Sequence, residues 1–269
     1  MDQLKAIAEA ALLGLIQGLT EFLPVSSSGH LELAKHILGY EAPLLFTVLL
    51  HLGTLGAVFL AFRRKIGALL AALFRIIFRR KKEGDDELGR LWILLLISTA
   101  ATVPLVIVFS MINDYVNAHP KLIGVCFLIT AAVLVATIFF KAVSGRERPG
   151  IGGAVAIGAL QGVAVLSGVS RSGMTVGAGL AAGLDRAKAA EYSFLLAIPA
   201  ILGGFLWELK DAPRTLESVS VGGLIAGVVT AFLTGLAAIL LLVKLVKIGK
   251  FWLFALYLAP LGVLTIIFA

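Results

Sequence analysis

Long apolar stretches separated by short basic segments dominate this sequence. We predict six membrane-spanning helices in them, at residues 43–62, 91–111, 121–140, 187–209, 219–243 and 251–268. Each stretch is close to the ~20 residues that a helix needs to cross a bilayer. With 59% hydrophobic and 14% charged residues, the composition excludes an ordinary soluble domain. The sequence therefore predicts an all-α polytopic membrane protein.

Lys and Arg residues cluster in the segments between the apolar stretches. Of 23 such residues, 17 fall in the connectors that we place in the cytoplasm, at 63–90, 141–149, 186–188 and 244–250, and 5 fall on the opposite side. Cytoplasmic loops carry an excess of Lys and Arg, so this split predicts a plasma-membrane protein with both termini outside. Within the first connector, residues 66–78 predict an amphipathic helix. A net charge of +7 that is spread over such loops argues against nucleic-acid binding.

One short stretch, residues 17–30, is polar although its surroundings are apolar. Its sequence is Gln-Gly-Leu-Thr-Glu-Phe-Leu-Pro-Val-Ser-Ser-Ser-Gly-His. Gln17 and Glu21 are four residues apart and share one face of a helix. Pro24 disfavours helix at the residue before it, so we expect this helix to stop there and a second one to cover about 30–38. A helix, a polar loop and a second helix can build an anion site inside a membrane.

The same pattern occurs a second time, 144 residues later. Gln17 aligns with Gln161, and both copies continue with Gly, six further residues and Val-Ser-x-Ser-Gly. The two copies differ at three polar positions. Where the first copy has Glu21, Ser27 and His30, the second copy has Val165, Arg171 and Met174. Self-similarity at a fixed offset indicates a duplication, although a chance match in a Gly-rich apolar chain is the alternative. The two copies would share a scaffold and differ in chemistry.

Each half of the chain then contains one re-entrant hairpin and three spans. The first repeat covers residues 1–145 with its hairpin at about 4–38, and the second covers residues 146–269 with its hairpin at about 150–184. Three crossings take the chain to the other side of the membrane before the second half begins. The first hairpin therefore enters the membrane from outside and the second from the cytoplasm. This inverted repeat predicts that the two polar tips, at 24–29 and 167–171, meet near the midplane.

An arginine inside the membrane is costly and by default indicates a function with a partner. Arg171 has no carboxylate beside it in the sequence. One interpretation is a structural ion pair with Glu21 across the interface of the two repeats. The other is that the guanidinium grips an anion, because its planar fork matches phosphate oxygens in a bidentate way.

The two polar stretches resemble the signature motifs of the undecaprenyl-diphosphatase (bacitracin-resistance) family. The similar segments are Gln17-x-x-x-Glu21, the run Pro-Val-Ser-Ser-Ser-Gly-His at 24–30, and Gly-Val-Ser-Arg-Ser-Gly-Met-Thr at 168–175. Length, span count and motif positions agree over essentially the whole chain. The resemblance implies a hydrolase that removes the terminal phosphate of the C55 polyprenyl diphosphate carrier used in cell-wall assembly. It also implies a divalent cation, Mg²⁺ or Ca²⁺, and a site that opens to the extracytoplasmic side.

Two positions depart from the pattern that this resemblance implies. Gln17 stands at the first acidic position of the first motif, an exchange that the family also shows, and it removes the charge of one metal ligand. Ser167 stands where the second motif usually begins with proline. The second change should loosen the loop but leaves its Ser-Arg-Ser core intact.

The residue types then predict individual roles. Ser27 is the expected nucleophile, and His30, one helical turn away, is its expected general base. Glu21, together with Gln17, is expected to hold the cation, or Glu21 orients His30. Arg171 is expected to stabilise charge on the transferring phosphoryl group. Further donors to the substrate phosphate are expected from the other polar side chains of the motifs, with capping as the alternative role: Ser26, Ser28, Ser170, Ser172 and Thr175.

The sequence leaves several alternatives open. A transporter or flippase of polyprenyl phosphate or another anion would use the same architecture, but acid, nucleophile and base occur in one copy only, which favours an enzyme. His51, in the middle of the first predicted span, is either a site residue or a satisfied histidine of the helix bundle. Gly14 and Gly18 predict close helix packing. A homodimer is compatible with the sequence, which does not decide it.

Overall fold

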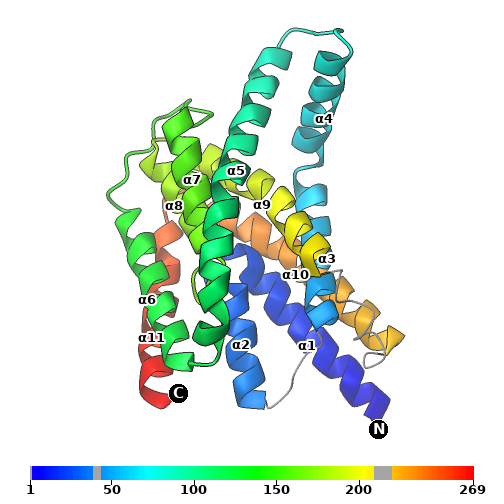
Figure 1. Cartoon of the computed structure of the whole chain (residues 1–269), viewed down its shortest axis with the longest axis vertical. Helices are drawn as coiled ribbons and strands as arrows, with labels where there is room; N and C mark the ends of the chain where they lie inside the picture. Colours follow the sequence, from blue (N-terminus) through cyan, green and yellow to red (C-terminus); the bar gives the residue numbers. More distant parts are fainter. Residues whose placement is uncertain (1, 39–43, 209–219) are drawn as a thin grey trace.

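The computed structural model of the protein is built from helices (Figure 1). The structure describes residues 2–38, 44–208 and 220–269, and these residues contain no strand. The described helices are α1 (Asp2–Phe22), α2 (Ser27–Leu38), α3 (Leu44–Ala61), α4 (Arg63–Ile77), α5 (Asp85–Asn117), α6 (Pro120–Ala136), α7 (Ile151–Val163), α8 (Arg171–Ala181), α9 (Arg186–Glu208), α10 (Val221–Lys247), the short 3-10 helix η3 (Phe251–Phe254) and α11 (Ala255–Phe268). The all-α prediction is confirmed.

Four described helices are long and apolar enough to cross a membrane. They are α5, the part of α9 at Arg186–Leu206, α10, and η3 joined to α11. A fifth candidate is the pair of α3 and α4, which is bent by 82° between the two helices. At 17 residues, α6 is slightly shorter than a full span. The membrane character is thus confirmed, and the number of six spans stays a prediction.

An extension formed by α4 and the start of α5 projects from one end of the bundle (Figure 1). α5 has 33 residues, about 50 Å of helix, so it is longer than the ~30 Å hydrocarbon core. α4 matches the amphipathic helix expected at 66–78, because it buries Ile66, Leu69 and Ala72 and leaves Arg63 and Arg64 exposed. The start of α1 and the end of α11 both lie at the opposite end of the molecule (Figure 1).

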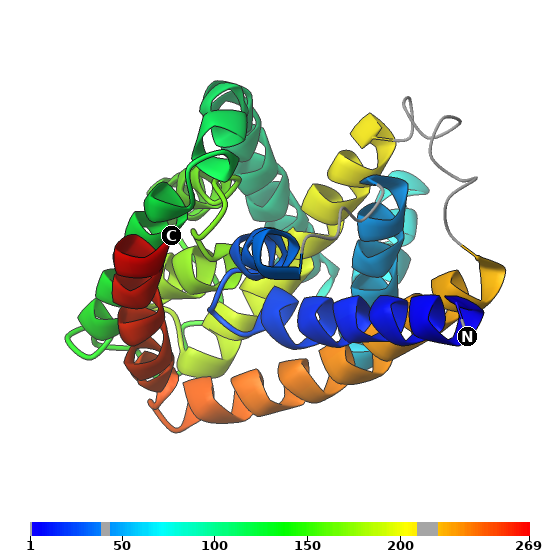
Figure 2. The ribbon, with the colours of Figure 1, turned by 90° about the horizontal axis from the view of Figure 1, so that it is seen from below.

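Glycines allow the helices of the two halves to pack closely. α1 lies along α10 (Figure 2), and α7 packs in the same way against α5. A Cβ atom on Gly14 would lie 2.2 Å from the carbonyl oxygen of Gly227, and one on Gly158 would lie 2.0 Å from that of Ser98. Because Gly14 and Gly158 are 144 residues apart, the same contact occurs in both halves. The close packing predicted for Gly14 is confirmed, whereas the inverted orientation of the repeats stays a prediction.

Several predicted boundaries need correction. α2 begins at Ser27 and not near residue 30, and α8 begins at Arg171, because a serine caps each helix one residue earlier. α6 ends at Ala136, four residues before the predicted end of that span, and the chain continues in turns. The predicted repeat boundary at 145 lies in the connector between α6 and α7. Several predicted features lie outside the described residues: span limits at 43, 209 and 219, and the outer cations Lys210 and Arg214.

Candidate active site

The first polar loop follows the end of α1 at Phe22. Ser26 has a φ angle of +68°, in the left-handed region that few residues other than glycine adopt. Its Oγ accepts a hydrogen bond from the backbone N–H of Gly29 at 3.4 Å, which caps α2. Ser27 is therefore the first residue of a helix, beside backbone N–H groups that carry partial positive charge.

The second polar loop is built in the same way. Gly168 has a φ angle of +96°, and the Oγ of Ser170 accepts a hydrogen bond from the N–H of Gly173 at 3.1 Å. Thr130 of α6 holds this loop, because its Oγ1 accepts from the N–H of Ser170 and donates to the carbonyl of Gly168, both at 3.0 Å. Arg171 is the first residue of α8. It thus occupies the position in its helix that Ser27 occupies in α2.

The two loops touch each other. The backbone N–H of Gly168 donates a hydrogen bond to the Oγ of Ser26 at 3.0 Å. Contact is close, since a Cβ atom on Gly29 would lie 2.8 Å from the nitrogen of Gly168. The predicted meeting of the two tips is confirmed, and its depth in the bilayer stays a prediction.

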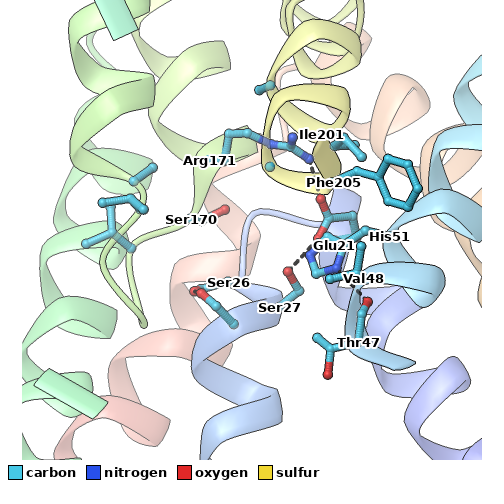
Figure 3. Close-up of a pocket in the computed structure, with 16 residues that line it drawn as sticks. Glu21, Ser26, Ser27, Thr47, Val48, His51, Ser170, Arg171, Ile201 and Phe205 are labelled. Carbon is cyan, nitrogen blue, oxygen red and sulfur yellow. Dashed lines mark hydrogen bonds and ion pairs between the residues drawn. The ribbon is translucent and has the colours of Figure 1, made fainter. Parts of the chain in front are cut away.

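A cavity of about 250 Å³ lies beside the loops (Figure 3). This volume is several times the ~30 Å³ that one water molecule occupies in the liquid, so it can hold a phosphate-sized group. The polar side chains that line it come from α1, α2, α3, α8 and the loops before α2 and α8: Glu21, Ser26, Ser27, Ser28, Thr47, His51, Ser170 and Arg171. The rest of the lining is apolar and comes from α3, the second loop and α9: Val48, Ala164, Val165, Val169, Ala200, Ile201, Gly204 and Phe205.

Glu21 joins the two halves of the site. Its Oε2 accepts hydrogen bonds from the Oγ of Ser27 at 2.5 Å and from the Nε2 of Gln17 at 2.9 Å. Its Oε1 accepts a hydrogen bond from the Nη2 of Arg171, with which it forms an ion pair. The side chain of Glu21 is only 5% exposed, and these donors offset the cost of burying its charge. Arg171 therefore pairs with Glu21 and also lines a cavity that suits an anion.

His30 does not line this cavity. Its Nδ1 lies 2.8 Å from the carbonyl oxygen of Ser26, and its Nε2 lies 2.7 Å from the Oη of Tyr257 on α11. The rings of His30 and Tyr257 are stacked, with centroids 5.7 Å apart. The expected contact between His30 and Ser27 is absent among the described residues, where Ser27 donates to Glu21.

The other expected site residues divide into two groups. Ser28 and Ser170 line the cavity. Gln17, Ser172 and Thr175 are buried and do not line it. The Oγ of Ser172 lies 3.2 Å from that of Ser170, and Thr175 donates to the backbone of its own helix. Both residues therefore stabilise the second loop and α8 and do not face the cavity.

Two further residues support the site: His51, for which the sequence left a site role open, and Asn113, which the sequence did not single out. His51 lines the cavity, with its Nδ1 2.9 Å from the carbonyl oxygen of Thr47 and its Nε2 3.6 Å from the Oε2 of Glu21 (Figure 3). A histidine within an apolar span was the available signal. Asn113 of α5 accepts a hydrogen bond from the N–H of Ser167 at 2.9 Å and thereby holds the second loop. No feature of the sequence around Asn113 indicated this contact.

Comparison with known proteins places the chain in a family. The model of the family described as bacitracin resistance protein BacA matches residues 10–264. The chain belongs to this family. An undecaprenyl-diphosphatase of Treponema denticola is 41% identical over 259 residues, which is 96% of this chain and 95% of the relative. Undecaprenyl-diphosphatases of Desulfatibacillum aliphaticivorans (42% identical, 93% and 94% covered) and Korarchaeum cryptofilum (38% identical, 96% and 97% covered) are also similar. In this BacA family member, the match includes both polar loops and every described helix that contributes to the cavity.

Proposed function

We propose that this protein is a membrane phosphatase that hydrolyses undecaprenyl diphosphate to the monophosphate and inorganic phosphate. It would thereby recycle the lipid carrier for cell-wall glycan synthesis and confer resistance to bacitracin. Family membership and the names of the relatives support this activity. The observation that carries the proposal is the 2.5 Å hydrogen bond from the Oγ of Ser27 to Glu21, whose other oxygen binds Arg171.

Ser27 is the proposed nucleophile. As its Oγ attacks the terminal phosphorus, a new O–P bond forms, the anhydride P–O bond breaks, and the electron pair leaves on the polyprenyl monophosphate. The hydroxyl proton passes to the Oε2 of Glu21, to which it is already bonded. Water then cleaves the serine phosphate, and Ser27 recovers its proton from Glu21. A covalent intermediate of this kind divides one difficult step into two easier ones.

Glu21 takes the part that the sequence suggested for His30. A general base must lie within hydrogen-bond reach of the proton that it removes. Glu21 meets this condition in the structure, and His30 instead bonds to Tyr257 and to the backbone of Ser26. We therefore assign His30 to the positioning of the first loop.

Arg171 would stabilise the transferring phosphoryl group. Its guanidinium carries five N–H donors, and in the described structure one of them bonds to Glu21. The remaining donors can bind phosphate oxygens without loss of that ion pair. The N-termini of α2 and α8, at Ser27 and Arg171, both lie at the cavity and favour an anion there. Ser26, Ser28 and Ser170 add hydroxyl groups.

Oxygen atoms at this site fit a divalent cation that binds together with the substrate. Mg²⁺ usually takes one or two carboxylates plus substrate phosphates and water. Glu21 provides one carboxylate, and the buried Oε1 of Gln17 has no hydrogen-bond partner among the described residues. The described part of the chain holds no cluster of three His, Cys, Asp or Glu residues that would bind a metal by itself. Glu21 would hold Mg²⁺ or Ca²⁺, which would neutralise phosphate charge, whereas Gln17 does not line the cavity and would support Glu21 through its Nε2.

The orientation proposed for the site is toward the extracytoplasmic side. The excess of Lys and Arg in the connectors at 63–90, 141–149, 186–188 and 244–250 supports it. The basic turn after α4 lies at the end of the molecule opposite the start of α1 and the end of α11, which agrees with both termini outside (Figure 1).

One assay tests the proposed function. The purified protein in detergent is given C55 polyprenyl diphosphate, and inorganic phosphate is measured with Mg²⁺ or Ca²⁺ and again with EDTA. We expect release with the cation and a strong loss with EDTA. No release under either condition would refute the phosphatase and favour a transporter or flippase, whereas full release in EDTA would refute only the cation.

A further inference from the structure

We propose that a second cavity, beside the start of α9 and the end of α10, binds the phosphate group of an anionic phospholipid. Arg186 and Lys247 would hold the phosphate oxygens. This basic cavity shares no lining residue with the catalytic cavity, and the proposed topology places it on the cytoplasmic side. The inference goes beyond the proposed phosphatase function and does not depend on it.

Three connecting segments of the chain meet at the basic cavity, which has a volume of about 290 Å³. The lining residues come from the α6–α7 connector, the start of α9 and the last turn of α10: Ala142, Ser144, Asp185, Arg186, Ala187 and Lys247. The N–H of Asp185 donates to the carbonyl of Arg146 at 2.9 Å, and the N–H of Val143 donates to that of Gly183 at 3.2 Å. The cavity can hold a phosphate-sized group, and backbone hydrogen bonds fix two of its walls.

The turn after α10 places Arg186 at the cavity. A Cβ atom on Gly249 would lie 3.0 Å from the Nη1 of Arg186, so the absence of a side chain there leaves room for the guanidinium. Lys247 lies two residues before this glycine, in the last turn of α10, and its side chain is exposed. The two cations therefore reach one cavity from two elements that contact each other.

Neither cation has a polar partner in the described part of the chain. No hydrogen bond or ion pair joins the side chain of Arg186 or Lys247 to another described residue. Asp185 is the acidic residue in the lining, and its Oδ1 accepts a hydrogen bond from the N–H of Ala187 at 2.9 Å. The lining thus has two positive charges that lack a counter-charge of their own, and a guanidinium suits phosphate oxygens because its planar fork binds them in a bidentate way.

A neighbouring basic cluster shows the contrast. Lys65 and Lys188 both pair with Glu191, at 3.2 and 3.4 Å, and Arg148 pairs with Glu87. The cavity beside these residues has a volume of only about 60 Å³. An anion would have to break these ion pairs in order to bind there, whereas at Arg186 and Lys247 it would break none.

Exposed apolar side chains beside the basic cavity favour a phosphate that carries acyl chains. Val143 and Ile248, each next to a lining residue in the sequence, are 51% and 55% exposed. Leu240 lies seven residues before Lys247, on the same face of the membrane helix α10, and is 62% exposed. A phospholipid could therefore place its phosphate at the two cations and its chains along α10, as basic pockets between membrane helices do for anionic lipids.

Binding of short-chain lipids tests the site. The purified full chain in detergent is titrated with dioctanoyl phosphatidylglycerol, and Kd is obtained from the rise in melting temperature with ligand concentration. Dioctanoyl phosphatidylcholine has the same chains but no net charge, and glycerol 3-phosphate has the phosphate but no chains. Phosphatidylglycerol should bind about 10-fold more tightly than either. Equal binding of the two lipids would overturn the site.

Two lysines of α10 provide a matched pair of variants. Lys247→Gln and Lys244→Gln each remove one exposed lysine from the last turn of the helix, and only Lys247 lines the basic cavity. Lys247→Gln should weaken the binding of phosphatidylglycerol about 5-fold, the effect of one cation at an anionic membrane surface. Lys244→Gln and Lys247→Arg should keep the affinity of the unchanged protein. The same Kd in Lys247→Gln and Lys244→Gln would overturn the site.

The catalytic cavity also suits a phosphate, but it is identical in these variants, so a difference between Lys247→Gln and Lys244→Gln reports on the basic cavity. If glycerol 3-phosphate binds as tightly as phosphatidylglycerol and depends equally on Lys247, the phosphate site is supported and the phospholipid is refuted as its source. Phosphate release from C55 diphosphate without added lipid should be unchanged in Lys247→Gln. Because Kd is read without turnover, a failure of the proposed phosphatase function would leave this test decisive.

Discussion

The backbone N–H of Gly168 donates a hydrogen bond to the Oγ of Ser26, which lies 142 residues earlier in the chain. Both residues have positive φ angles, so each loop presents an unusual backbone conformation to the other. The next helical residues in the two loops, Ser27 and Arg171, then reach the same carboxylate of Glu21. This contact holds Ser27, the proposed nucleophile, near the guanidinium of Arg171.

Loss of the contact between the loops should lower stability. Ser26 is 4% exposed, so Ser26→Ala leaves the N–H of Gly168 buried without its partner, at a cost of about 1–3 kcal/mol. Ser26→Gly removes the same oxygen but permits the positive φ angle, and it should be the less damaging change by ~1 kcal/mol. Melting temperatures in detergent test both. A Ser26→Ala protein as stable as the unchanged one would contradict the proposed role of this bond.

Ser27 and Glu21 should act as one catalytic unit. Ser27→Ala and Glu21→Gln should each reduce kcat by about 10³-fold or more, and the double variant should lose little beyond that, because residues that act together are non-additive. Phosphate release with C55 diphosphate measures all three. If the losses of kcat in the two single variants multiply in the double variant, Glu21 does not act as the base for Ser27. Ser28→Ala is the control, with a mild expected effect, since no described contact joins Ser28 to the carboxylate.

Arg171 should matter for both turnover and stability, in ways that two variants distinguish. Arg171→Lys keeps a cation near Glu21 but loses the planar fork, so kcat should fall by about 10²-fold while the melting temperature changes little. Arg171→Ala leaves the buried Glu21 without its ion pair, and the melting temperature should drop as well. Normal turnover in Arg171→Lys would restrict Arg171 to a structural ion pair.

Asp85 should make the α4–α5 extension sensitive to acid. It lies six residues before the apolar stretch of α5, and its carboxylate accepts hydrogen bonds from Arg75 at 2.5 and 2.8 Å and from the N–H of Lys82 at 2.8 Å. These bonds, those from Arg75 first, lower the pKa of Asp85 from 3.8 to about 2. Because the folded pKa is below the unfolded one, the stabilisation is complete above about pH 5 and is lost as the pH falls through 4 toward 2.

Limited proteolysis of the turn after α4 measures this effect. Asp85→Asn should increase cleavage at pH 7 and remove the change between pH 4 and 2. Asp86→Asn is the matched control, since Asp86 is 78% exposed and pairs only with Lys81 in the described structure. Equal cleavage of the two variants at pH 7 would show that the Asp85 pair contributes nothing.

The proposed topology places the turn between α4 and α5 in the cytoplasm. Glu83 is exposed in this turn, whereas Gly84 has a φ angle of +86° that a cysteine would strain. In a Cys126→Ala background, Glu83→Cys should react with a membrane-impermeant thiol reagent only after the cells are opened. Reaction in intact cells would place this turn outside and reverse the topology.

Local features of the sequence predicted most of the helices and both loops, but not every helix boundary. Apolar length predicted the membrane helices, and Pro24 and the repeated serine motif predicted where α1 and α7 give way to polar loops. The amphipathic pattern at 66–78 predicted α4, and the glycine at 14 predicted close packing. Each of these signals depends on a few neighbouring residues, so none of them requires the tertiary structure.

The partners of the polar groups depended on the tertiary structure. By itself the sequence determined that Glu21, Ser27, His30 and Arg171 would lie at two meeting loops. Only the packing decided that Ser27 bonds to Glu21, that His30 turns toward Tyr257, and that α9 contributes apolar residues to the cavity lining. The physical reason is that a hydrogen bond depends on the positions of two atoms to within a few tenths of an ångström. For groups on different helices, those positions are set by how all the helices pack.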